Sequence, residues 1–177
     1  IIKLDVPDEL YCSVIHPQIE ISTRESREIL PSEISLSKAI RQWGNTAALV
    51  AGLLKSDYGL ISRSLEDVVI EPVRSQLIPG FSDIKKAAIE SGALGCSISG
   101  SGPSVFALSR GSETAEKAGL AMQQSLLKHQ LRSELYVSKI NLNGPRIIEL
   151  NQHYETLQHK RQKQACNLQG GSHKRHI

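Results

Sequence analysis

The segment GCSISGSGPSVFAL, residues 95–108, constrains the fold most, because it places a glycine-rich loop between two short runs typical of β-strands. Gly100 and Gly102 can adopt backbone angles closed to other residues. Pro103 donates no N–H group and stiffens the exit from the loop. The segment therefore predicts a β-hairpin whose connecting loop lets another group approach the backbone closely.

From its spacing alone, this loop has two possible roles. The amides of Gly100, Ser101 and Gly102 could form a concave nest for an anion, or the loop could simply connect two strands. It is not a Walker phosphate loop, because no Gly-Lys-Ser/Thr follows it. A strand rather than a helix comes after it, which also excludes a dinucleotide-binding fingerprint.

The remaining elements follow from periodicity and from helix-capping and breaking residues. We expect strands at 11–17, 95–99, 104–109 and 134–142, a short edge at 146–150, and helices at 22–30, 35–55, 58–69, 82–91 and 113–131. A turn-rich connector is expected between the third and fourth helices. The helix at 113–131 is expected to have an inner face formed by Ala115, Ala118, Met122 and Leu126. The order predicts an α+β fold, a ferredoxin-like two-layer sandwich with an antiparallel sheet and helices on one face.

The clearest helix is the one at 35–55. Six apolar residues spaced alternately four and three apart form one stripe along it: Leu36, Ile40, Trp43, Ala47, Val50 and Leu54. Such a stripe is typical of a helix face that packs on a core. We therefore expect Trp43 to be a core residue.

Composition and charge exclude several classes of protein. The 177-residue chain is 40% hydrophobic and 22% charged, and no apolar run approaches the roughly 20 residues that a membrane span needs. Its net charge of +3 arises in residues 151–177, which hold five Lys or Arg against one Glu. We expect a globular domain at 1–150, a polar basic tail at 151–177 that is disordered or non-native, and no nucleic-acid or membrane partner.

Cysteine usage indicates neither a metal site nor a disulfide framework. Cys12, Cys96 and Cys166 are far apart, odd in number and without a Cys-x-x-Cys pair. The Asp residues show no paired spacing typical of a metal site. Cys12 and Cys96 lie in apolar runs, so we expect them to be small buried residues in a protein of the reducing cytoplasm.

Three blocks of the sequence resemble the homoserine kinases of the GHMP small-molecule kinase superfamily. The segment GALGCSISGSGPSVFAL resembles the third motif of the superfamily, and STRESREILP and EPVRSQLIPGF precede it in the same order as in homoserine kinases. The resemblance runs from about residue 6 to about residue 148 and matches the C-terminal half of those enzymes. It implies the GHMP kinase C-terminal domain over residues 1–150.

The resemblance also implies an activity and a set of site residues. Such an enzyme transfers a phosphoryl group from ATP, with Mg²⁺, to the hydroxyl of L-homoserine on the pathway to threonine, in the cytoplasm and as a homodimer. Arg27 and Arg74 match the arginines that hold the substrate carboxylate, a role suited to the planar guanidinium group. Gly100 matches the loop position against the substrate, and Ser99, Ser101 and Gly102 would shape the floor of the site.

The parts of the family that bind the ATP phosphates and the attacking hydroxyl are not matched in this sequence. Because phosphoryl transfer depends on positioning and charge stabilisation, we expect the chain alone to be inactive and to hold no catalytic residue. Glu71, three residues before Arg74, could orient that guanidinium or bind the substrate amino group. The alternatives are another GHMP kinase, with a mevalonate-type or sugar substrate, a non-catalytic amino-acid-binding module of ferredoxin-like fold, and a structural dimerisation domain.

Overall fold

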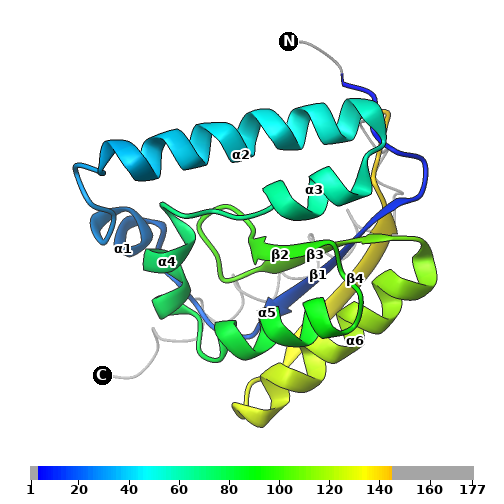
Figure 1. Cartoon of the computed structure of the whole chain (residues 1–177). Coiled ribbons are helices and arrows are strands. Elements are labelled where there is room, and N and C mark those ends of the chain that lie inside the picture. The colour runs from blue at the N-terminus through cyan, green and yellow to red at the C-terminus, as the bar shows by residue number, and fades with distance from the viewer. Residues whose placement is uncertain (1–3, 145–177) are drawn as a thin grey trace, which may run out of the picture. The chain divides into compact units, whose positions relative to one another are not determined.

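Four antiparallel strands form one sheet in the order β2–β3–β1–β4, in a computed structural model that describes residues 4–144 (Figure 1). The strands are β1 (Leu10–Pro17), β2 (Gly95–Ile98), β3 (Val105–Arg110) and β4 (Ser133–Lys139). The first strand lies between β3 and β4, and β2 pairs with β3 across the predicted hairpin. This is the strand order of a ferredoxin-like sandwich, so the predicted α+β fold class is confirmed.

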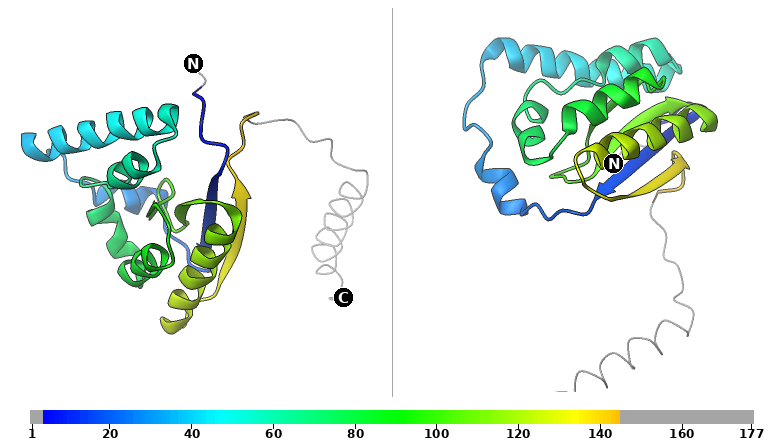
Figure 2. Two further views of the ribbon diagram at one scale, coloured as in Figure 1. Left: turned by 45° about the vertical axis from the view of Figure 1, so that its right-hand side comes forward. Right: turned by 90° about the horizontal axis from the view of Figure 1, so that it is seen from below.

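The helices form two groups around the sheet (Figures 1 and 2). Their bounds are α1 (Thr23–Glu28), α2 (Leu36–Lys55), α3 (Tyr58–Ser64), α4 (Glu71–Arg74), α5 (Phe81–Glu90) and α6 (Ser112–Lys128), with one 3-10 turn at Ser75–Leu77. Helices α5 and α6 pack side by side over one face of the sheet. Helices α2 and α3 pack against each other, and α3 contacts β2.

Side-chain caps fix where three of these helices begin. The hydroxyl of Ser22 accepts the N–H of Arg24 at 3.2 Å at the start of α1. Ser35 caps α2, and the carboxylate of Asp57 accepts the N–H of Leu60 at 2.9 Å in α3. Each cap binds an N–H group that the helix itself cannot satisfy, so the boundaries read from these residue types are confirmed.

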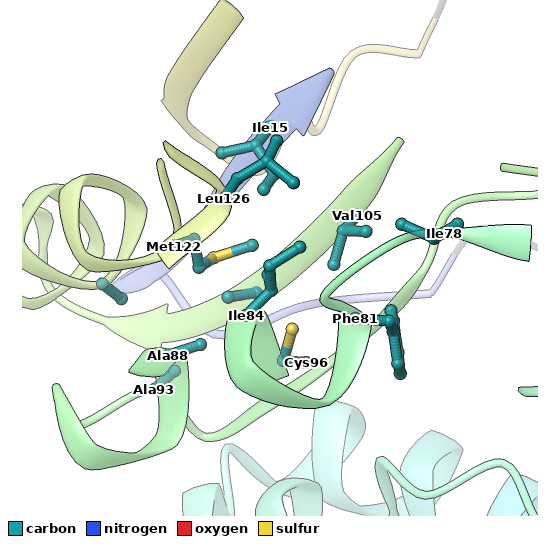
Figure 3. Close-up of a cluster of buried hydrophobic side chains, with 12 residues drawn as sticks. Ile15, Ile78, Phe81, Ile84, Ala88, Ala93, Cys96, Val105, Met122 and Leu126 are labelled. Atoms are coloured by element: carbon teal, nitrogen blue, oxygen red, sulfur yellow. The ribbon is translucent and has the colours of Figure 1, made fainter. Parts of the chain in front are cut away.

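The core lies between the sheet and the helix pair α5–α6 (Figure 3). Ile15 and Val105 from the strands, Ile84 from α5, and Met122 and Leu126 from α6 are each 0% exposed. The α6 residues are spaced four apart, as expected for one face of a helix. The inner face predicted for this helix from its sequence is thus confirmed.

The apolar stripe of α2 does not face this core. Leu36, Ile40, Trp43 and Leu54 are 68%, 58%, 64% and 52% exposed, whereas the buried residues of the helix are the small Ala39 and Gly52. The prediction that Trp43 packs in the core is therefore wrong. Close packing of α2 on α3 explains the buried side, because a Cβ on Gly52 would lie 3.0 Å from Ile61.

The region between α3 and α5 differs most from the predicted elements. Helix α3 ends at Ser64 rather than near residue 69, and the expected connector contains the short helix α4. The cause is Asp67, whose carboxylate accepts the N–H groups of Val69 and Ile70, each at 2.8 Å. Those donors are satisfied by a side chain instead of by a continuing helix.

Two sequence-based predictions fall outside the described residues, namely the strand edge at 146–150 and the tail at 151–177. The chain divides into two units after Leu142, and only two residues of the second unit are described. The expected boundary at residue 150 therefore remains a prediction.

Burial of Cys96 predicts a pH dependence of stability. Desolvation raises the pKa of this thiol to about 12, whereas a thiol in an unfolded chain has a pKa near ~8.5. The folded state therefore holds its proton more tightly, and the stabilisation is complete below pH ~8.5 and is lost as the pH rises toward 12. Between pH 9 and 11, the free energy of unfolding should fall more steeply for the native chain than for Cys96→Ala, by up to about 1.4 kcal/mol per pH unit. Parallel curves in urea denaturation would contradict this.

Candidate functional site

The glycine loop forms a tight turn that ends β2 and begins β3. The N–H of Gly102 donates to the carbonyl of Ser99 at 3.1 Å, and the N–H of Ser99 donates to the carbonyl of Ser104 at 2.8 Å. Gly100 and Gly102 have φ angles of +61° and +84°, so both use the left-handed region predicted for them. A Cβ built on Gly100 would meet nothing within 4 Å, which leaves its outer side open.

An anion nest, one of the two roles that the spacing of this loop allowed, would have fewer amides than the three considered. Within residues 4–144, no group accepts the N–H of Gly100 or Ser101, and both donors remain free for a ligand. The N–H of Gly102 is already used inside the turn. Two amides rather than three are thus available.

Arg74 connects this loop to helix α1. Its Nε donates to the carbonyl of Ser26 at 3.1 Å, and its Nη1 donates to the carbonyl of Gly100 at 2.9 Å. A guanidinium carries five N–H groups, so three remain without a partner among the described residues. Arg74 is half-buried, and its position beside an open loop leaves a cation able to bind a carboxylate.

Helix α1 approaches the same loop through Ser26. This hydroxyl is 0% exposed and donates to the carbonyl of Ser101 at 3.1 Å. Arg27 is the next residue, and its exposed side chain makes no hydrogen bond or ion pair within the described part of the chain. The structure therefore brings the backbone of Arg27, the side chain of Arg74 and the glycine loop together, and the direction in which Arg27 points toward a ligand remains a prediction.

An open depression borders the other side of the loop. It is lined by His16 near the end of β1, by Pro103, by the segment that leads into α1, namely Ile19, Glu20, Ile21 and Ser22, and by Glu25 in the first turn of α1. The Nδ1 of His16 lies 2.8 Å from the hydroxyl of Ser104, so this ring fixes the start of β3 to β1. No pattern in the sequence identified this contact, which joins residues 88 positions apart.

No hydrogen bond or ion pair joins the carboxylate of Glu71 to the guanidinium of Arg74, so Glu71 does not orient it by direct contact, which was one possibility that the sequence suggested. Its carboxylate is 8% exposed and pairs with the ammonium of Lys85 on α5. The hydroxyl of Ser97 on β2 donates to its second oxygen at 2.6 Å. Both oxygens are therefore turned away from the guanidinium, toward the sheet and α5.

The described residues offer no metal site and no membrane helix. Within 4–144, no three His, Cys, Asp or Glu side chains lie close enough together to hold an ion. In the same range, no helix is both long enough and apolar enough to cross a bilayer. The groups that the structure brings together at the candidate site are the loop amides and the side chain of Arg74.

Comparison with known proteins shows a similarity to the GHMP kinases. Residues 49–128 match the family described as GHMP kinases C terminal. The homoserine kinase of Chlorobium phaeovibrioides is 54% identical over 150 residues, which cover 84% of this chain and 47% of the relative. Residues 49–128 thus match the C-terminal domain of the GHMP kinases, and the chain is similar to the C-terminal part of the homoserine kinases.

Solved structures of GHMP kinases show the same similarity. The crystal structure of homoserine kinase from Cytophaga hutchinsonii matches with a TM-score of 0.81 and 54% identity, over 83% of this chain and 47% of that one. A Streptococcus pneumoniae phosphomevalonate kinase in complex with phosphomevalonate and AMPPNP shares the fold, with a TM-score of 0.60 and 15% identity over 77% of this chain and 41% of that one. The chain spans about half the length of the homoserine kinases that it matches.

Proposed function

We propose that this chain is the C-terminal part of a homoserine kinase, which transfers the γ-phosphoryl group of ATP to the hydroxyl of L-homoserine. The product would be O-phospho-L-homoserine, on the route to threonine. The similarity to homoserine kinases supports this substrate. The observation that carries the proposal is Arg74, which is held between α1 and the glycine loop and has three N–H groups without a partner within residues 4–144.

The chemistry of the site suits an amino-acid substrate. Arg74 presents a planar cation, which binds a carboxylate through paired hydrogen bonds. Arg27 would add a second cation beside Ser26, and the open side of Gly100 would let the substrate lie against the backbone. The free amides of Gly100 and Ser101 add two neutral donors to the same floor.

We further propose that ATP and Mg²⁺ are held mainly by the part of the homoserine kinases that this chain does not span. The described residues provide no cluster of oxygen ligands for the ion, and the two free amides of the loop are a small part of a phosphate cradle. When bound, the nucleotide supplies the phosphoryl group and the ion neutralises its charge. The chain alone would thus bind substrate without turning it over.

The exposed apolar stripe of α2 is consistent with a second part of the kinase that packs against this chain. Four large apolar side chains line one side of a 20-residue helix, and each is more than half exposed. A contiguous patch of this kind marks an interaction surface. We propose that the unspanned part of the kinase packs on the stripe formed by Leu36, Ile40, Trp43 and Leu54.

Completing the protein tests the proposal. The part of the Cytophaga hutchinsonii enzyme that this chain does not span is joined to the matched region of this chain, to give a completed kinase. ADP release with L-homoserine should approach the ~10 s⁻¹ of a typical enzyme, whereas the chain alone should show no turnover. The proposed function would be overturned by a completed kinase that unfolds cooperatively and binds ATP but leaves L-homoserine unphosphorylated. Turnover by the chain alone would overturn the proposal that ATP and Mg²⁺ are held mainly by the unspanned part.

A further inference from the structure

Helix α4 carries Arg74 but is too short to hold its own position. It spans only Glu71–Arg74, and a single turn of helix is not stable in isolation. Its start is fixed by Asp67, whose second carboxylate oxygen accepts the N–H of Glu71 at 3.2 Å. Something else must hold the helix against the sheet if Arg74 is to meet the glycine loop.

Glu71 supplies that second attachment. Its carboxylate is 8% exposed, and it accepts hydrogen bonds from Lys85 on α5 and, at 2.6 Å, from Ser97 on β2. Lys85 also lies over the ring of Phe81, 6.0 Å from its centroid. A carboxylate this buried is costly to leave unpaired, so the two partners hold it firmly.

The two ends of α4 bind the same strand and loop. Glu71 reaches Ser97 and Arg74 reaches Gly100, and each pair is separated by 26 positions in the chain. One contact lies at Ser97, one residue before the end of β2, and the other lies at Gly100 in the loop itself. The Glu71 contact thus sets the position of α4 along β2, and with it the place of the Arg74 guanidinium over the loop.

We propose that Glu71 is a positioning residue, which holds Arg74 where it can bind the carboxylate of the substrate and so makes the site selective for amino acids. The inference rests on the proposed function. Glu71 does not touch the substrate. It acts through α4, with Lys85 and Ser97 as its partners.

The test compares two ligands of the completed kinase, L-homoserine and 3-amino-1-propanol, which has the same hydroxyl and amino group but no carboxylate. Glu71→Gln should raise the KM for L-homoserine about 10-fold, less than the ~100-fold that a 1 Å misplacement can cost. It should leave kcat and the inhibition constant of 3-amino-1-propanol within about 2-fold. Glu9→Gln, which makes the same change in the exposed Glu9–Arg110 ion pair, is the matched control and should change neither ligand.

Equal weakening of both ligands by Glu71→Gln would mean a general structural role and would overturn the proposal, as would an unchanged KM for L-homoserine. A completed kinase without homoserine activity would instead overturn the proposed function. A measurement on the 177-residue chain tests the positioning separately, because the Nε–H of Arg74 donates to Ser26. The hydrogen exchange of this Arg74 Nε–H group, followed by NMR, should be about 10-fold faster in Glu71→Gln than in Glu9→Gln. Equal exchange rates in the two variants would refute the role of Glu71.

Discussion

Replacing Arg74 by lysine is expected to lower kcat/KM for L-homoserine in the completed kinase by about 100-fold, mostly through KM. Losing one partner of a desolvated, hydrogen-bonded charge pair costs roughly 2–5 kcal/mol, and lysine retains the charge but not the fork. Lysine also cannot donate to Ser26 and Gly100 with the geometry that the guanidinium uses. Steady-state kinetics with L-homoserine as the varied substrate measure the loss.

Arg24→Lys is the matched control for this change. Arg24 lies on the same helix as Ser26, but its side chain is 85% exposed and, in the part of the chain that the structure describes, pairs only with Glu28. Exposed ion pairs contribute little, so this variant should stay within about 2-fold of the native kinetics. If Arg74→Lys also stayed within 2-fold, Arg74 would be a structural link between α1 and the loop and the carboxylate site would lie elsewhere.

The sheet and its two covering helices could be predicted from the sequence because their signals are local. The alternation in residues 95–108 gave the hairpin, and the spacing of Ala115, Ala118, Met122 and Leu126 gave the buried face of α6. Ser22, Ser35 and Asp57 marked helix starts through contacts with N–H groups two or three residues away. For each of these caps, the N–H group that the side chain binds is close to it in the sequence.

The contacts that build the site could not be predicted in this way. Arg74 meets Ser26 and Gly100 across 48 and 26 positions, and only the resemblance to homoserine kinases placed these blocks together. The spacing of Glu71 and Arg74 was also misleading. Residues three apart on a helix can interact, but these two side chains form no hydrogen bond or ion pair with each other. Here the buried carboxylate gains more from Lys85 and Ser97 than it would from the half-exposed guanidinium of Arg74.

The sequence periodicity of α2 predicted the apolar stripe of this helix correctly, but the expectation that the stripe faces the core was wrong. A stripe at 3.5-residue spacing shows that one side of a helix is apolar, but not which surface covers it. Gly52, on the side opposite the stripe, allows α2 to lie close to α3, while Gln42 and Asn45 bind the backbone of the 66–68 segment. The side opposite the stripe is thus small and polar, and the stripe itself is left exposed among the described residues.

The stripe predicts a large difference between the chain alone and the completed kinase. Trp43 is the only tryptophan of this chain and is 64% exposed, so in the chain alone its fluorescence should be that of a hydrated indole, open to quenching by iodide. In the completed kinase, the emission assigned to Trp43 by difference from Trp43→Phe should move to shorter wavelength and resist quenching. A shift that appears in the chain alone and grows with protein concentration would identify a second copy as the partner instead.

A charged residue introduced into the α2 stripe should destabilise the completed kinase, where the stripe would be covered, but not the chain alone. Trp43→Glu should change the free energy of unfolding of the chain alone by no more than about 0.5 kcal/mol, as at other exposed sites. In the completed kinase it should cost at least 2 kcal/mol, because a tryptophan at the centre of an apolar interface is a typical hot spot. Leu127→Glu, at a residue of α6 that is 53% exposed outside the stripe, should have a small effect in both proteins. Equal effects of the two substitutions in the completed kinase would show that nothing docks on α2, since the stripe would then behave as ordinary surface.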